Sequence, residues 1–323
     1  MTLAAMLIGI VALVQTTALR PDPPKICDAC DAWNRPLAPF QVFGNTYYVG
    51  TEGLSAVLVT SERGHVLLDG ALPQSAPLIE RNIRALGFHL ADVRLIVNSH
   101  AHYDHSGGIA ALQRASGAEV AASAWGARVL ETGEPTPDDP QHGFGRDATA
   151  FPPVAKVRSV RDGETLRVGD LAITARLTPG HTPGSTTWTW KSCAGTRCLD
   201  VVYADSLNAV SASGFRFTAK PELIESFRRS IAAVAALPCD ILLSVHPGFS
   251  RLEQKLARRQ ANPKVNAFVD AGACRAYAAD AAKRLEQRLA EEKSAGAKSP
   301  GLRTAQSLHV PRRPTRSGGL SRS

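Results

Sequence analysis

The chain has 323 residues, of which 44% are hydrophobic and 20% are charged. This composition is typical of a globular protein with a sizeable core, and it excludes a disordered or fibrous chain. Of the net charge of +8, +6 falls in the acid-free tail Ser294–Ser323, so residues 1–293 carry only +2. The folded part therefore offers no support for nucleic-acid binding.

The two ends of the chain differ from its middle. Residues 1–14 are apolar and uncharged, and the small residues Thr16 and Ala18 follow at a possible cleavage site. Because this stretch is short for a membrane span, we interpret residues 1–18 as a secretory signal. It lacks a Lys or Arg near its start, so a retained anchor or an apolar stretch without a targeting role stays open. The tail 294–323 is rich in Ser, Gly and Pro, which predicts a disordered basic segment. We expect it to be solvated and without a partner.

Alternating apolar runs predict the elements of the first half. A hairpin joins the second and third of these strands, and Gly87 ends the first helix. Residues 134–153 are dense in Pro, Gly and Asp and predict a long loop. The expected strands are 46–49, 56–60, 65–69, 93–98 and 118–122, and the expected helices are 73–86, 108–115 and 125–131.

The second half repeats this pattern. We expect strands over 156–160, 165–168, 171–177, 186–191, 199–204 and 240–245, with helices over 221–237 and 270–293. Two β-rich halves, each closed by helices, predict an α/β fold of four layers, in which two sheets lie face to face with helices outside. No linker divides residues 34–293, so we predict one folded domain over residues 19–293.

The six Cys fall into three sets: Cys27 with Cys30, Cys193 with Cys198, and Cys239 with Cys274. All of them lie outside the His-rich stretch described next, which favours disulfides in an oxidising compartment over metal ligands. The segment Cys27–Cys30 also matches a CxxC redox or metal motif, although no second pair lies near it in the sequence.

Residues 100–105 read His-Ala-His-Tyr-Asp-His and are the most informative stretch of the chain. They lie between the strand 93–98 and the helix 108–115, on a tight turn where several side chains can converge on one point. Imidazole and carboxylate without thiolate suit zinc, and suit iron or manganese less well. The stretch therefore predicts a site for two metal ions. A His-rich surface loop is the alternative, but three of only nine His are gathered here.

Two later His have comparable settings. His181 lies in Pro-Gly-His-Thr-Pro-Gly, and His246 follows an apolar strand. Because strand ends on one edge of a sheet sandwich meet in space, we expect these two residues to join the 100–105 stretch in one site. The remaining His lack such settings and are interpreted as surface or structural residues: His65, His89, His142 and His309.

The stretch 100–105 matches the HxHxDH signature of the metallo-β-lactamase superfamily, and His181 and His246 match its two later metal positions. The match covers roughly residues 34–290 and implies an αββα sandwich, which the strand and helix pattern indicates independently. The ligand set resembles subclass B3 of the metallo-β-lactamases. Other segments agree with that subclass: Gly44–Gly50, Asn82–Gly87, Pro179–Gly184, Tyr203–Leu207 and Cys239–Leu242.

This resemblance implies two zinc ions per chain, the first bound by His100, His102 and His181 and the second by Asp104, His105 and His246. A hydroxide that the metals share would attack the β-lactam carbonyl of penicillins, cephalosporins and carbapenems, and Asp104 would orient it as the catalytic residue. The implied protein is a periplasmic monomer without stable membrane anchoring that confers antibiotic resistance.

Residues 205 and 206 decide between members of the superfamily. Glyoxalases and lactonases have an Asp near here that bridges both metals, whereas subclass B3 has a Ser that we align with Ser206. A shift of one residue would make Asp205 the bridging ligand. Ser206, Asn208 and Gln141 are the candidate substrate contacts, with ordinary loop residues as the alternative for the last two. Trp33 and Phe144 are candidates for an apolar lid.

The resemblance also implies the disulfides Cys193–Cys198 and Cys239–Cys274. The family's third disulfide would pair Cys27 with a cysteine at position 52, where this chain has Glu52, so Cys27 pairs with Cys30 or both are free. Two other functions stay open. One is a related two-metal hydrolase of lactones or thioesters, similar to glyoxalase II. The other is a non-catalytic exported zinc-binding protein, against which the six intact ligand positions argue.

Overall fold

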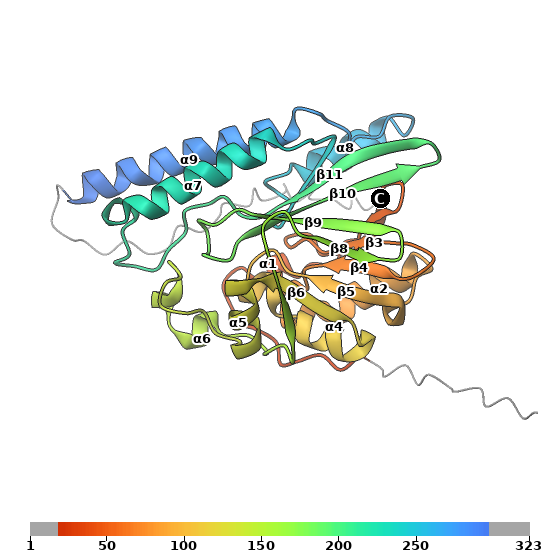
Figure 1. Cartoon of the computed structure of the whole chain (residues 1–323), viewed down its shortest axis with the longest axis horizontal. Helices are drawn as coiled ribbons and strands as arrows, with labels where there is room; N and C mark the ends of the chain where they lie inside the picture. The colour runs from red at the N-terminus through yellow and green to blue at the C-terminus, as the bar shows by residue number, and fades with distance from the viewer. Residues whose placement is uncertain (1–18, 297–323) are drawn as a thin grey trace, which may run out of the picture.

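Two mixed β-sheets form the centre of the computed structural model, which describes residues 19–296 (Figure 1). In the seven-stranded sheet the strands follow chain order, antiparallel from β1 to β4 and parallel from β4 to β7. This sheet consists of β1 (Phe40–Phe43), β2 (Thr46–Tyr48), β3 (Val57–Val59), β4 (His65–Leu68), β5 (Val93–Val97), β6 (Glu119–Ser123) and β7 (Val157–Val160).

The five-stranded sheet has the order β12-β11-β10-β9-β8 and is parallel only between β11 and β12. Its strands are β8 (Thr165–Val168), β9 (Leu171–Leu177), β10 (Thr186–Ala194), β11 (Arg197–Ala204) and β12 (Ile241–Ser244).

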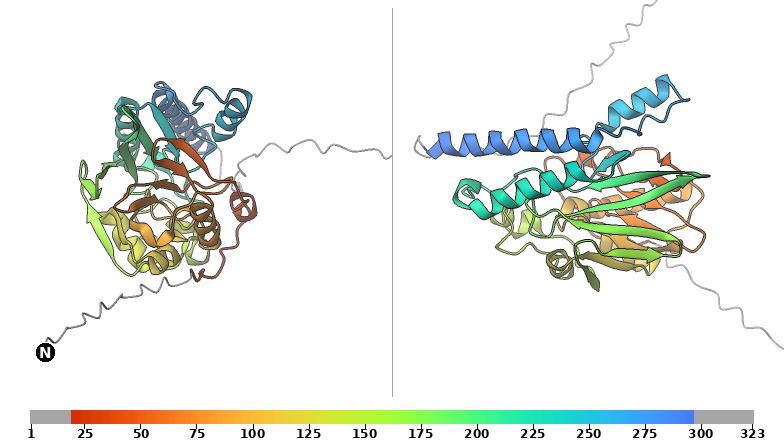
Figure 2. Two further views of the ribbon diagram at one scale, coloured as in Figure 1. Left: turned by 90° about the vertical axis from the view of Figure 1, so that its right-hand side faces the viewer. Right: turned by 45° about the horizontal axis from the view of Figure 1, so that its top comes forward.

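Helices cover the outer face of each sheet (Figure 2). The first sheet packs against α2 (Ala76–Ala85), α4 (Ile109–Ser116) and α5 (Ala124–Thr132), and the second against α7 (Pro221–Ala236) and α9 (Ala273–Gly296). The remaining helices are α1 (Cys30–Trp33), α3 (Tyr103–Ser106), α6 (Arg146–Thr149) and α8 (Leu252–Ala261). The predicted α/β sandwich of four layers, with helices outside two mixed sheets, is confirmed.

Three apolar layers hold these elements together, because the inner strands are buried on both faces. In β3, Val57 and Val59 face the second sheet, while Leu58 packs against the outer helices. In β11, Tyr203 faces the first sheet, and Val202 packs under α7 and α9. This alternation of period two explains why the strands read as continuous apolar runs.

The structure differs from the expected elements at several places. Strand β1 and helix α8 were not predicted, since β1 is short and follows Pro39, and α8 buries only Leu252 and Lys255. The helix expected over 73–86 is a 3₁₀ turn, Pro73–Ser75, followed by α2. The loop expected over 134–153 contains a 3₁₀ turn, His142–Phe144, and α6. Two further 3₁₀ turns are Leu90–Asp92 and Phe217–Ala219.

The last helix extends beyond its expected end, since α9 begins at Ala273 and continues to Gly296. The interpreted signal 1–18 and the tail residues 297–323 lie outside the described residues, so both stay predictions. Within residues 19–296 there is no helix both long and apolar enough to cross a membrane.

All six cysteines are paired in the structure. Cys193–Cys198 closes the hairpin of β10 and β11, and Cys239–Cys274 ties the start of β12 to α9. Cys27 pairs with Cys30, which is the first of the two states that the sequence left open. By closing loops, such links reduce the freedom of the unfolded chain and stabilise the fold.

Candidate metal centre

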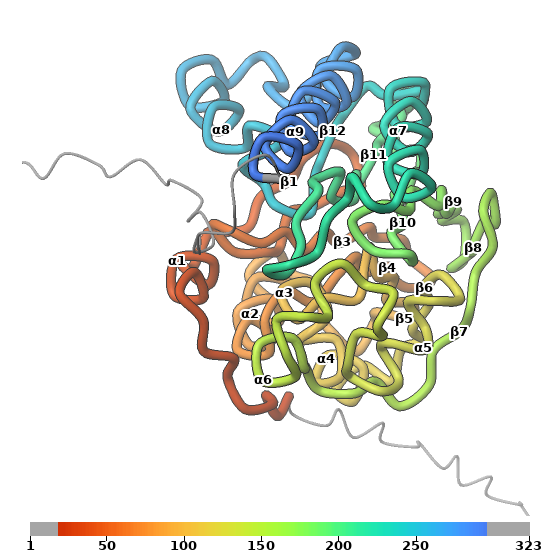
Figure 3. The backbone as a smooth tube through the Cα atoms, turned by 90° about the vertical axis from the view of Figure 1, so that its left-hand side faces the viewer, coloured from red at the N-terminus to blue at the C-terminus, as the bar shows by residue number. Residues whose placement is uncertain are grey.

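Strand ends bring the predicted ligands to one edge of the sandwich. The stretch 100–105 follows β5 and runs into α3, His181 lies in the turn between β9 and β10, and His246 follows β12. The segment after β11 supplies Asp205 and Ser206 at the same edge. In Figure 3, the part of this segment that leads into α7 lies between α9 and α6.

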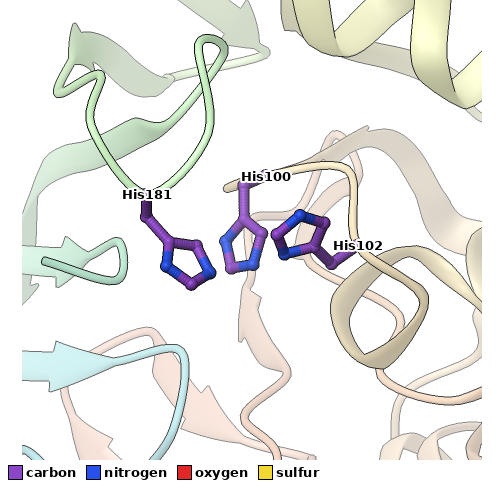
Figure 4. A group of neighbouring side chains, drawn as sticks. All are labelled: His100, His102 and His181. Atoms are coloured by element: carbon purple, nitrogen blue, oxygen red, sulfur yellow. The ribbon is translucent and has the colours of Figure 1, made fainter. Parts of the chain in front are cut away.

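The first group of donors consists of His100, His102 and His181, whose rings converge (Figure 4). One ring nitrogen from each lies within 4.8 Å of those from the other two, and all three side chains are buried. The ring centroids of His100 and His181 are 4.7 Å apart, and those of His102 and His181 are 5.1 Å apart. Buried imidazoles so close together fit a shared divalent metal ion.

Each ring of the first group has one nitrogen held by a partner outside the group. Nδ1 of His100 lies 2.6 Å from Oδ1 of Asp205, and Nε2 of His102 lies 2.9 Å from Oδ2 of Asp139. Nδ1 of His181 donates to the carbonyl oxygen of Asn208 at 2.8 Å. Such partners fix the tautomer and leave the opposite nitrogen to bind metal. Nε2 of His100 is buried and has no hydrogen-bond partner among residues 19–296, as a metal ligand requires.

The second group consists of Asp104, His105 and His246. Oδ2 of Asp104 lies 3.3 Å from Nε2 of His105 and 3.3 Å from Nε2 of His246, and those two nitrogens are also 3.3 Å apart. These three donor atoms form an equilateral triangle. A tetrahedrally coordinated ion with metal–ligand bonds of about 2.0–2.1 Å, the usual Zn–N and Zn–O lengths, has ligand atoms at this spacing. The second group therefore fits a divalent ion as well.

The electrostatics favour the metal-binding forms of three residues. Burial, together with neighbouring imidazoles, holds the pKa of His100 well below its usual range and lowers the pKa of His181 to about 3, so both rings are neutral. Burial alone would raise the pKa of Asp104, but His105 and His246 beside it hold that pKa well below its usual range. Neutral imidazole and ionised carboxylate are the states that bind metal.

Asp205 contacts the first donor group through the ring of His100. It is fully buried, and its carboxylate lies against Nδ1 of His100, whereas Nε2 of that ring faces the group. This position is that of an orienting partner rather than a bridging ligand. Asp139 has the same relation to His102. Neither role was predicted for these two residues, and only the density of acids in 134–153 pointed toward the second.

The candidate substrate contacts differ in their surroundings. Gln141 lines a cavity of about 210 Å³, and its Nε2 lies 3.4 Å from Nε2 of His181. By contrast, Asn208 uses both ends of its amide within the protein, because Oδ1 accepts from Arg284 and Nδ2 donates to Oγ of Ser206. The other residues lining the cavity are His102, Tyr103, Phe144, Ala148 and Thr149.

The two lid candidates lie on opposite sides of the site. The ring of Phe144 lines the cavity beside the first group and is 42% exposed. The ring of Trp33 lies 5.4 Å from that of His246 in the second group. Of the His residues interpreted as structural, His65 is buried in β4 against Phe88, while His309 lies outside the described residues.

Comparison with known proteins shows which family and which solved structures this chain resembles. Residues 49–246 match the family model described as "Metallo-beta-lactamase superfamily". Rm3 metallo-beta-lactamase is 53% identical, with a TM-score of 0.80, over 83% of this chain and 99% of that structure. MEM-A1, a subclass B3 metallo-beta-lactamase from a soil metagenome library, is 51% identical, with a TM-score of 0.77, over 81% of this chain and 99% of that structure.

Curated sequences give more distant matches. Hydroxyacylglutathione hydrolase of Anaeromyxobacter dehalogenans is 30% identical over 165 residues, which are 51% of each chain. The enzyme of the same name from Jannaschia sp. is 30% identical over 139 residues, which are 43% of this chain and 42% of its own. This chain thus spans about half the length of the curated relatives it matches.

Proposed function

Because this chain belongs to the metallo-β-lactamase superfamily, we propose that it hydrolyses the β-lactam ring of penicillins, cephalosporins and carbapenems. The observation that carries the proposal is the 53% identity to Rm3 metallo-beta-lactamase over 99% of that structure. Thioester hydrolysis is less favoured, since the hydroxyacylglutathione hydrolases match at 30% identity over at most about half of the chain.

We propose two zinc ions per chain, because the first donor group consists of imidazoles and the second of imidazoles and a carboxylate, with no thiolate in either. His100, His102 and His181 would bind the first ion, and Asp104, His105 and His246 the second. When bound, such a pair would polarise the lactam carbonyl and supply a nucleophile by lowering the pKa of water toward neutrality.

The chain's own residues position the reactants around that pair. Asp104 is the proposed catalytic residue, because its ionised carboxylate lies at the boundary of the two groups, where it can accept a hydrogen bond from the attacking water. Gln141 lines the cavity, and its Nε2, which lies 3.4 Å from Nε2 of His181, would donate to the substrate once that ring nitrogen binds metal. Phe144 and Trp33 would shield the reaction from bulk water.

Ser206 and Asn208 contact each other and would act together. Oγ of Ser206 accepts from both nitrogens of Asn208, at 3.4 Å from the backbone and 3.3 Å from the side chain, so its own hydrogen stays available. We propose that this hydroxyl donates to a water or to the substrate carboxylate. Asn208 contributes by holding that hydroxyl and the His181 ring.

We further propose that the protein is a periplasmic monomer that confers resistance to β-lactam antibiotics. Three disulfides support an oxidising compartment, since such bonds persist mainly outside the cytoplasm. The interpreted signal over residues 1–18 would deliver the chain there. Labelling of cell fractions tests the location, and a comparison of antibiotic susceptibility with and without the gene tests the resistance. The mass of the purified protein in solution tests the monomer.

The central test is hydrolysis by the purified protein. Zinc-loaded protein should hydrolyse a carbapenem, a cephalosporin and a penicillin much faster than a glutathione thioester, and a chelator should abolish the activity until zinc is restored. A higher kcat/KM for the thioester would move the chain to the alternative function. No chelator-sensitive hydrolysis of these substrates or of a lactone would leave only the non-catalytic zinc-binding protein.

A further inference from the structure

One face of α9 holds the segment that follows β11. Oη of Tyr277 donates to the carbonyl oxygen of Asp205 at 2.6 Å, and Nε of Arg284 donates to Oδ1 of Asn208 at 2.6 Å. Further along the same face, Nη2 of Arg288 donates to Oγ of Ser211 at 2.9 Å. Side chains seven and four residues apart share one side of a helix. α9 therefore aligns the whole segment from one side (Figure 3).

This segment carries the outer partners of two metal ligands. The Asp205 carboxylate orients His100, and the Asn208 carbonyl orients His181. α9 contacts both partners, because Tyr277 holds the first and Arg284 the second. The geometry of the first donor group thus depends on a helix that supplies no ligand.

Arg284 contacts a neighbour of one proposed ligand in each donor group. Its guanidinium lies 4.8 Å from the ring centroid of Phe249, and that ring lies 6.2 Å from the ring of His246 at an angle of 83°. On its other side it holds Asn208, the partner of His181. Its Nη2 is buried without a hydrogen-bond partner in the described part of the chain, and the bond from Nε to Asn208 is a polar contact that holds the guanidinium.

We propose that Arg284 is a positioning residue that fixes Asn208 and, through its carbonyl oxygen, the metal-binding orientation of His181. The inference rests on the proposed function, because it takes His181 as a zinc ligand. Asn208 is held at both ends of its amide, by Arg284 and by Ser206, so its carbonyl has little freedom to turn away from the ring. Loss of such an outer partner typically weakens metal binding by about 10–100-fold.

The test replaces Arg284 while keeping its apolar contact with Phe249. Arg284→Met removes the hydrogen bond and retains the length of the side chain. We expect the affinity for one of two zinc ions, measured by competition with a chromophoric chelator, to fall about 10–100-fold. The d–d absorption spectrum of the cobalt-substituted protein should change as well, because the geometry around His181 changes. Arg284→Lys should restore part of the affinity, since Lys can still donate to Asn208.

Lys283→Met is the matched control. Lys283 neighbours Arg284 in the chain, is 80% exposed and contacts only Asp280 among the ion pairs of the described residues. The substitution removes the same charge from α9, so zinc affinity and the cobalt spectrum should stay unchanged. If Lys283→Met lowers the zinc affinity as much as Arg284→Met does, the loss comes from the missing positive charge. That result would overturn the proposal.

A double-mutant cycle with Asn208→Ala tests whether Arg284 acts on His181 through Asn208. It also separates this effect from general damage to the fold. If Arg284 acts through Asn208, the double variant should lose no more zinc affinity than the more affected single variant, whereas independent losses would add. Additive losses, or wild-type affinity in Arg284→Met, would overturn the proposal. These readouts need no β-lactam, so a wild-type protein that binds two zinc ions and opens no β-lactam would reject the proposed function alone.

Discussion

The two donor groups differ in how firmly the protein holds them. In the first group, every ring is buried and bonded to a carboxylate or carbonyl oxygen at 2.6–2.9 Å. In the second group, the side chain of His246 is 19% exposed, and its Nδ1 lies 3.4 Å from the carbonyl oxygen of Gly53. Ligands oriented in advance bind metal more tightly. We therefore expect the first ion to bind more tightly than the second.

The largest effect should come from removing one ligand from each group. His181→Ala should lower the affinity for the first ion by more than the ~100-fold that loss of an outer partner can cause. His246→Ala should leave one tightly bound ion. Zinc content after dialysis measures both outcomes. Equal zinc content in the two variants would contradict the ranking of the groups.

Asp205→Asn should have the next largest effect, because it weakens the partner of His100 without changing its shape. We expect the affinity for the first ion to fall about 10–100-fold while the second ion still binds. Isothermal titration with zinc distinguishes the two ions. Complete loss of the second ion would instead make Asp205 a bridging ligand and would reject the subclass B3 assignment.

Removal of metal by a chelator should release the second ion first. Trp33 lies 5.4 Å from His246, so its fluorescence should report departure of the second ion. We expect that signal at chelator concentrations at least ~10-fold below those that remove the first ion. Trp33→Phe should abolish the early signal, which checks its source among the four tryptophans. A single concerted release would mean that the two groups do not differ.

The smallest effect should come from Lys255, which contacts the strand that leads to His246. Nζ of Lys255 on α8 donates to the carbonyl oxygen of Leu242 in β12, the strand that leads to this ligand. Burial lowers the pKa of Lys255 to about 8. Between that pKa and the usual value of 10.5 the unfolded chain binds more protons than the folded chain, so stability should rise with pH.

This pH dependence can be measured by urea denaturation at pH 8 and pH 9. The wild-type protein should gain about 1 kcal/mol more over this interval than Lys255→Met, which has no titrating group at this position. An identical pH dependence in both proteins would show that the Lys255 ammonium is not perturbed in the folded state.

Candidate ligands could be read from the sequence, whereas the residues that hold their rings could not. His100, His102 and Asp104 lie in one short stretch next to a buried strand, so their chemistry and position are readable together. Asp205 is 105 residues from His100, and Asp139 is 37 residues from His102. Which ring nitrogen a distant carboxylate faces depends on the register of strands and the path of loops, which no local pattern encodes.

The same limit applies to the fold. The inner strands were predictable because burial on both faces gives continuous apolar runs. β1 and α8 were missed, because a strand of four residues is short and α8 buries only Leu252 and Lys255. The role of Arg284 was equally hidden, since a charged residue on a helix ordinarily indicates only a solvated surface.

The position of α9 near the end of the chain has a consequence for maturation. Tyr277 and Arg284 contact the outer partners of His100 and His181, and both follow all six proposed ligands in the sequence. A chain that emerges in order from its N-terminus would contain every proposed ligand before it gained this helix. We therefore expect metal to be captured late, after α9 docks, and a chain that stops at Gly272 should retain less zinc than the full protein.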